Sequence, residues 1–181
     1  SDVEEVLDRQ ISYNMAISQE GMQGDYGANV GRVLNETYGS LDVMFRAKAA
    51  AAAASDARMG GCSLPVVINS GSGNQGITTS VPVILYAKEL GVDREKMLRA
   101  LVLSNLITIH QKRRIGRLSA YCGAVSAGAA AGAGIAYLDG GSYQDVIHTV
   151  VNALAIVSGI VCDGAKASCA GKIAAAVDAG I

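Results

Sequence analysis

Aromatic residues and prolines are scarce in this 181-residue sequence. Phe, Trp and Tyr together make up 4% of it, and Pro65 and Pro82 are its two prolines. So few aromatic rings argue against a protein that stacks nucleic acid bases. A charge excess is also missing, because 15 Lys and Arg face 16 Asp and Glu. The balance indicates neither nucleic acid nor an acidic membrane surface as a partner.

The sequence shows no pattern typical of a secretory leader or of a membrane-spanning helix. Residues 1–10 are charged, and the apolar stretches 49–54 and 123–136 are shorter than a bilayer-crossing helix. We therefore expect a cytoplasmic protein that does not bind membranes. In that compartment the four cysteines are expected as thiols or metal ligands and not as disulfides; they are Cys62, Cys122, Cys162 and Cys169.

Alanine and glycine are abundant, and these small residues favour helices that pack closely. The spacing of apolar residues and the turn residues predict one all-α domain over 1–181, with about six to eight Ala/Gly-rich helices. At most one or two short strands are expected, with 64–69 as the candidate. A basic connection is predicted at 112–117. The predicted helices cover 3–20, 29–38, 41–58, 75–90, 94–110, 119–138, 143–158 and 163–178.

The stretch SGSGNQG at 70–76 contains the G-x-G-x-x-G pattern of dinucleotide-binding loops. Asp93 lies 20 residues beyond Gly73, but it begins a capped helix and does not end a second strand. No Gly-Lys-Ser/Thr follows for a Walker loop. Two interpretations remain open. The loop amides could form a pocket for a carboxylate or phosphate, or the stretch could be a turn capped by Ser72 or Asn74.

Three of the cysteines lie in two small-residue segments. Cys162 and Cys169 are seven residues apart, which on a helix places them on one face about 10 Å apart along the axis. Cys122 and Cys162 lie near predicted helix starts, where a thiolate is stabilised. Each could be a metal ligand or a small buried apolar residue.

Several other polar residues are candidates for chemistry. Lys166, between two cysteines, and His110 could act as a base, although either could be a surface or helix-end charge. Arg117 could grip a substrate carboxylate or cap helix carbonyls. Asn69 and Asn74 could donate amide hydrogens to a substrate or shape the turn.

Three stretches together resemble one family. They are AAAASDARMGGCSLPVVINSGSGNQGITTSVPVI, IGRLSAYCGAVSAGAAAGAG and GIVCDGAKASCAGKIAAAV. In this order they resemble the L-cysteine desulfidase family, relatives of the iron–sulfur L-serine dehydratase alpha chain. The resemblance implies a helical lyase without pyridoxal phosphate. It would use an oxygen-labile [4Fe–4S] cluster to eliminate sulfide from L-cysteine, giving pyruvate and ammonia.

The resemblance also implies roles for particular residues. Cys122 and Cys162 match two cluster ligands, and a third is expected in an N-terminal region that this chain lacks. Cys169 lies in the same motif at a shorter spacing than in serine dehydratases, so its ligand role stays open. The resemblance places the loop near a small amino-acid substrate, with candidate contacts at Asn69, Ser70, Gly71, Ser72, Gly73, Asn74 and Arg117.

Family members are about twice as long as this chain. We therefore expect an internal or C-terminal fragment that is inactive alone and has an absent or incomplete cluster. An iron–sulfur L-serine dehydratase is the nearest alternative function. A dinucleotide-binding oxidoreductase domain built on Gly71, Gly73 and Gly76, and a helical scaffold with packing glycines, are the others. A homo-oligomer stays open.

Overall fold

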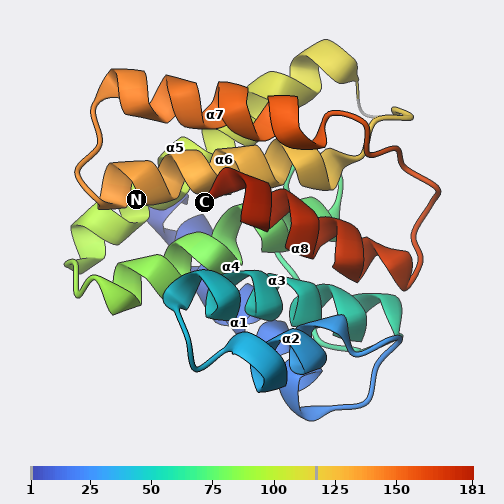
Figure 1. Ribbon diagram of the computed structural model, residues 1–181. Coiled ribbons are helices and arrows are strands. Elements are labelled where there is room, and N and C mark those ends of the chain that lie inside the picture. The colour runs from blue at the N-terminus through green and yellow to red at the C-terminus, as the bar shows by residue number, and fades with distance from the viewer. Residues whose placement is uncertain (1, 117) are drawn as a thin grey trace.

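Helices are the regular structure in the described part of the chain. The computed structural model describes residues 2–116 and 118–181. These residues form α1 (Asp2–Gln23), α2 (Val30–Tyr38), α3 (Val43–Met59), α4 (Gly73–Glu89), α5 (Arg94–Ile115), α6 (Gly123–Leu138), α7 (Tyr143–Val157) and α8 (Ser168–Gly180) (Figure 1). The predicted all-α fold is confirmed. Among the described residues, no helix has both the length and the hydropathy to cross a bilayer.

Two helices form the centre of the fold. α3 packs against α1, α2, α4 and α8, and α6 packs against α4, α5, α7 and α8. Figure 1 shows α7, α6, α8 and α3 stacked from top to bottom of the view. A central helix must be apolar around most of its circumference. This explains why α3 and α6 carry the alanine-rich segments of the sequence.

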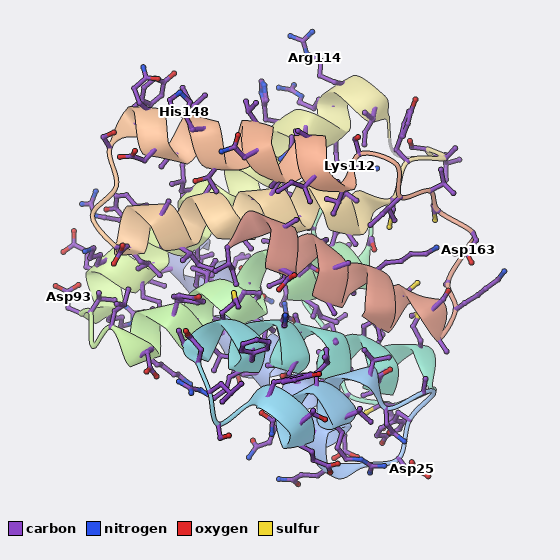
Figure 2. The ribbon with its side chains drawn as sticks, viewed as in Figure 1. Asp25, Asp93, Lys112, Arg114, His148 and Asp163 are labelled. Carbon is purple, nitrogen blue, oxygen red and sulfur yellow. The ribbon has the colours of Figure 1, made fainter. Side chains whose placement is uncertain are left out.

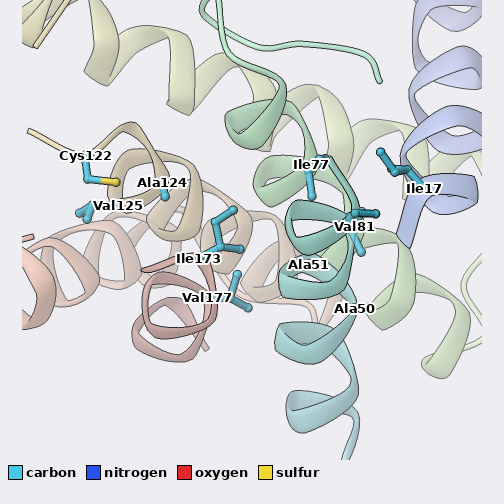
Figure 3. Packing of buried hydrophobic residues seen from close by; sticks show 12 residues of the cluster. Ile17, Ala50, Ala51, Ile77, Val81, Cys122, Ala124, Val125, Ile173 and Val177 are labelled. Carbon is cyan, nitrogen blue, oxygen red and sulfur yellow. The ribbon is translucent and has the colours of Figure 1, made fainter. Parts of the chain in front are cut away.

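Small residues let these helices approach one another closely. Residues 49–54 of α3 are all buried. On α6, a Cβ added to Gly132 would overlap the carbonyl oxygen of Gly180 on α8, so only glycine fits there. Larger side chains such as Ile77 and Ile173 fill the wider gaps (Figure 3). Close packing of this kind contributes most of the fold's stability.

The segment between α3 and α4 is extended but pairs with no strand. Asn69 and Ser72 form an isolated antiparallel pairing across a tight turn, so the strand considered at 64–69 is not formed. Asn14 of α1 holds the segment in place. Its Oδ1 accepts from Val67 N at 2.9 Å, and its Nδ2 donates to Gly76 O at 3.1 Å. This anchoring fixes the position of the glycine loop.

Three predicted helix boundaries are wrong by about four residues or more. α5 continues through the basic stretch 112–115, because Lys and Arg favour the last turn of a helix, and it ends at Gly116 with φ of +81°. α6 begins at Gly123, four residues later than expected, because residues 120–122 pair with another segment. α8 begins at Ser168. Gly164, with φ of +97°, keeps residues 163–167 out of the helix.

Candidate active site

A short backbone pairing brings Cys122 and Cys162 together although they are forty positions apart in the sequence. Cys162 N donates to Ala120 O at 2.6 Å, and Cys122 N donates to Ile160 O at 3.2 Å. Tyr121 and Val161 form the antiparallel pair between them. The loop before α6 and the loop after α7 are therefore tied together at the positions that carry the two thiols.

Three thiols and the glycine loop share one pocket of about 430 Å³. Cys122, Cys162 and Cys169 line it, and so does the loop. In Figure 3 the sulfur of Cys122 lies beside Ala124 at the edge of the apolar cluster. Cys122 is 8% exposed, Cys162 is exposed and Cys169 is partly buried. The pocket therefore joins a sulfur-rich wall to a helix N-terminus.

The donor set of this pocket fits an iron–sulfur cluster better than a single hard cation. No Asp, Glu or His among the described residues lines it, whereas three cysteines do. Thiolate sulfur is the ligand that iron–sulfur clusters take in proteins. In the described residues, no three His, Cys, Asp or Glu side chains are grouped tightly enough to hold one metal ion. A cluster takes its ligands around a larger body than one ion.

The surroundings of Cys122 have opposing effects on the pKa of its thiol. Burial raises the pKa of the Cys122 thiol, while a hydrogen bond from the backbone N–H of Ala124 and the positive charge of Lys172 lower it. The neighbouring Cys162 and Cys169 raise it further. A cationic group bound beside Cys122 would favour its thiolate form.

Lys172 of α8 fixes the loop that carries Cys162. Its Nζ donates to Val161 O at 3.1 Å and is paired with the carboxylate of Asp163. The pair raises the pKa of Lys172 and lowers the pKa of Asp163. Sequence analysis named Lys166 and not Lys172, although Lys172 lies one helical turn beyond Cys169 and thus on the same face of α8. That spacing is the signal that could have found it.

The glycine loop is a tight turn followed by a capped helix. Ser70 and Gly71 have φ of +51° and +84°, and Asn69 and Ser72 exchange two backbone hydrogen bonds across them. Ser72 Oγ accepts from Gln75 N at 3.3 Å and caps α4. The turn and the cap therefore form. Among the described residues, the N–H groups of the first two residues of α4, 73 and 74, have no acceptor.

The predicted substrate contacts lie on two sides of this loop. Gly71, Ser72 and Asn74 line the pocket. Asn69 does not line it. Its Nδ2 donates to Asn105 Oδ1 at 2.8 Å on the opposite side, and Ser70 Oγ donates to Asn69 Oδ1 at 2.8 Å.

Gly73 lies beneath the Arg58 side chain, against which a Cβ would collide. The predicted Arg117 lies outside the described residues. The structure therefore gives three of the seven predicted contacts a place in the pocket wall: Gly71, Ser72 and Asn74.

Neither predicted base lines the pocket. Lys166 is exposed and lies 3.8 Å from the Asp163 carboxylate. His110 is exposed on α5 and lines an adjoining hollow of about 440 Å³, which shares Tyr121 and Cys122 with the pocket.

Sequence analysis did not name Arg58, Gln75 or Lys112, which also line the pocket, as candidates. Lys112 was overlooked because 112–117 was predicted as a connection, whereas it belongs to α5 and is 5% exposed. Gln75 Oε1 is buried and has no hydrogen-bond partner among the described residues.

The dinucleotide-binding alternative is wrong. It required a parallel sheet around Gly71–Gly76, and the described residues contain no sheet there. The loop is preceded by an extended segment held by α1, and α4 leads directly to α5. The glycine pattern therefore forms a different turn from that of a Rossmann fold.

Comparison with known proteins identifies the family of the chain. A family model for the serine dehydratase alpha chain matches residues 1–181. A UPF0597 protein of Desulfitobacterium hafniense (strain Y51) is 71% identical over 180 residues, which are 99% of this chain and 42% of that protein. A UPF0597 protein of Lachnoclostridium phytofermentans is 64% identical over 183 residues, 99% of this chain and 44% of that protein.

No solved structure matches the chain. The chain spans less than half the length of these curated relatives. It belongs to the serine dehydratase alpha chain family.

Proposed function

We propose that this chain forms the cluster-binding part of an iron–sulfur lyase that eliminates sulfide from L-cysteine, giving pyruvate and ammonia. The observation that carries the proposal is the pocket that three cysteines line together with a capped helix N-terminus. The family supports a lyase of this kind. The resemblance of the three motifs to L-cysteine desulfidases supports the substrate.

We assign the cluster ligands to Cys122, Cys162 and Cys169. Cys169 supplies the third thiol from within the chain, because it lines the same pocket as the other two. When bound, a [4Fe–4S] cluster with three thiolate ligands supplies a Lewis-acidic iron to the leaving group of the substrate. The chain contributes the Ala124 N–H group at Cys122 and the ammonium of Lys172, both of which stabilise thiolate charge.

The loop has a separate role in this proposal, which is to hold the substrate carboxylate. The free N–H groups of residues 73 and 74 and the dipole of α4 attract an anion. A fixed, neutralised carboxylate orients the α C–H bond and makes its proton easier to remove. Lys166 and His110 lie outside the pocket, so neither is assigned as the base that takes this proton.

An iron–sulfur L-serine dehydratase is the second candidate, favoured by the description of the matching family. The two reactions differ in the leaving group, thiol or hydroxyl, and the pocket wall has the same donors for both. Turnover of L-cysteine and L-serine measured side by side, with pyruvate as the product, would separate them.

The test of the proposal is anaerobic purification of the full-length protein with its iron, sulfide, absorption spectrum and turnover measured. Cys122→Ser, Cys162→Ser and Cys169→Ser are each expected to lose the cluster absorbance and at least about 100-fold in turnover, because losing even a residue that only orients a metal ligand typically costs about 10–100-fold. Cys62→Ser is the control. Cys62 lies beside Tyr26, outside the pocket wall. A wild-type iron content in all three variants would refute the ligand assignment.

A further inference from the structure

The charges in the pocket wall are of one sign. Arg58 of α3 and Lys112 of α5 line the pocket, and no acidic residue in the described part of the chain lines it. The two side chains come from helices that are separate in the sequence, so the fold brings them to the same hollow. Two uncompensated cations beside a helix N-terminus attract a small anion.

Lys112 lies in an environment that is unusual for a lysine. It is 5% exposed, and its ammonium has no ion-pair or hydrogen-bond partner in the described residues. Arg114, two residues later, projects away from the bundle instead (Figure 2). A buried charge without a partner is destabilising. The pocket is where an anion could reach this charge.

Arg58 is held over the loop by a neutral partner. Its Nη1 donates to Asn74 Oδ1 at 3.3 Å, and no carboxylate in the described part of the chain pairs with it. Its side chain also covers Gly73. The guanidinium therefore lies next to the free amides of α4 while the rest of its hydrogen-bonding capacity stays available.

Gln75 adds an acceptor to the same wall. The residue is 7% exposed, and its Oε1 is buried without a partner among the described residues. Its side chain packs against Gly123, where a Cβ would overlap it. An unpaired buried acceptor is destabilising by about 1–3 kcal/mol, and a donor on a bound molecule would relieve it.

We propose that these three side chains form the recognition subsite for a zwitterionic α-amino acid. Arg58 and Lys112 bind the α-carboxylate together with the loop amides, and Gln75 Oε1 accepts from the α-ammonium. The subsite binds the α-carboxylate and α-ammonium that L-cysteine and L-serine share, and their side chains extend toward the thiols. The inference rests on the proposed function in placing an amino-acid substrate in this pocket.

The test uses L-alanine, which has the same α-carbon groups but no leaving group and is therefore not consumed. Calorimetric titration of the anaerobically purified protein gives its affinity, and L-alaninamide is the matched probe without a carboxylate. Lys112→Met and Arg58→Gln are each expected to weaken L-alanine binding by about tenfold to a hundredfold, the range for a hydrogen bond to a charged group. L-alaninamide binding is expected to change by less than about twofold.

The controls separate charge recognition from damage to the fold. Lys96→Met changes a lysine on the same helix outside the pocket wall and is expected to leave both affinities unchanged. Lys112→Gln keeps a polar side chain of similar length and is measured beside Lys112→Met with a circular dichroism spectrum. Gln75→Leu is expected to weaken L-alanine binding more than propionate binding, because propionate has no ammonium.

Two results would overturn the inference: wild-type protein that does not bind L-alanine, or Lys112 and Arg58 variants that bind it as the wild type does. Equal weakening of L-alanine and L-alaninamide would also overturn it. These results are independent of the proposed elimination. A protein that binds L-alanine through these residues but has no cluster and no turnover would refute the lyase and keep the subsite.

Discussion

Two groups of buried polar side chains lie on opposite sides of the glycine loop, and they differ in whether their hydrogen bonds are made. Between α1, α4 and α5, the side chains of Asn14 and Asn105 have partners on several elements. In the pocket, the buried Gln75 Oε1 and the ammonium of Lys112 have none among the described residues. Satisfied buried groups specify architecture. Unsatisfied ones indicate a surface that is completed by a ligand.

The largest effect is expected from breaking the satisfied group. Asn14 is fully buried and makes contacts with Val67, Gly76 and Ser80. Asn14→Leu would leave the Val67 N–H and the Gly76 carbonyl without this partner, and we expect a loss of about 3 kcal/mol in the free energy of unfolding. Urea denaturation measures it. The exposed Asn152→Ala is the control, with an expected change within about 0.5 kcal/mol. If Asn14→Leu also changed the free energy of unfolding by no more than about 0.5 kcal/mol, Asn14 would not hold the segment as described.

The pocket group is expected to respond in the opposite direction. Lys112→Met replaces a lysine that is 5% exposed, and whose ammonium has no partner in the described residues, by an apolar side chain of similar length. We expect ligand-free protein to gain about 1–3 kcal/mol of stability, because the unpaired buried charge is removed. Thermal unfolding without added amino acid or polyvalent anion measures this gain. A destabilised Lys112→Met protein would show that Lys112 has a structural partner.

A pair of buried threonines tests whether two buried hydroxyls that bond to each other stabilise the fold. The hydroxyls of Thr79 and Thr108 are buried and 2.5 Å apart. Thr79→Val leaves one hydroxyl without this partner and is expected to cost about 1 kcal/mol, whereas the double change to Val removes both hydroxyls and recovers most of the loss. Equilibrium unfolding of the two single variants and the double variant measures the coupling. Strictly additive losses would rule out the pairing.

The smallest effect is expected at a third buried group, Asp56 of α3. Its Oδ2 accepts from Gly31 N at 2.9 Å, its Oδ1 has no partner among the described residues, and burial raises its pKa. A raised pKa means that the folded state binds the proton more readily than the unfolded state. The stabilisation is therefore complete below the unfolded pKa and is lost as the pH rises through the folded pKa.

Asp56→Asn retains an acceptor for Gly31 N and removes the charge, so its stability is expected to vary less with pH across the weakly acidic range. Urea midpoints at several pH values for wild type and variant measure the difference. Asp25, exposed at the surface, gives the control Asp25→Asn. Parallel pH profiles for wild type and Asp56→Asn would contradict this account.

The sequence predicted the parts of the site that depend on local chemistry. The turn at Ser70 and Gly71, the cap at Ser72 and the helix that follows are specified by residues adjacent in the chain. The position of Lys112 could not be predicted in the same way. A run of basic residues favours a helix end and a polar connection almost equally, and the burial of one of them depends on what packs against it.

The sequence alone determined the helical character of this protein, its dense small-residue packing and the motifs of its family. These depend on propensity and on side-chain size, which every alanine and glycine carries wherever it lies. The tertiary structure alone decided that Cys122, Cys162 and Cys169 share a pocket with the loop, and that Asn69 faces the other way. The shared pocket depends on backbone pairing between residues 120–122 and 160–162. The orientation of Asn69 depends on its hydrogen bond to Asn105 in α5. Contacts between distant segments are set by packing of the whole chain, which no local pattern encodes.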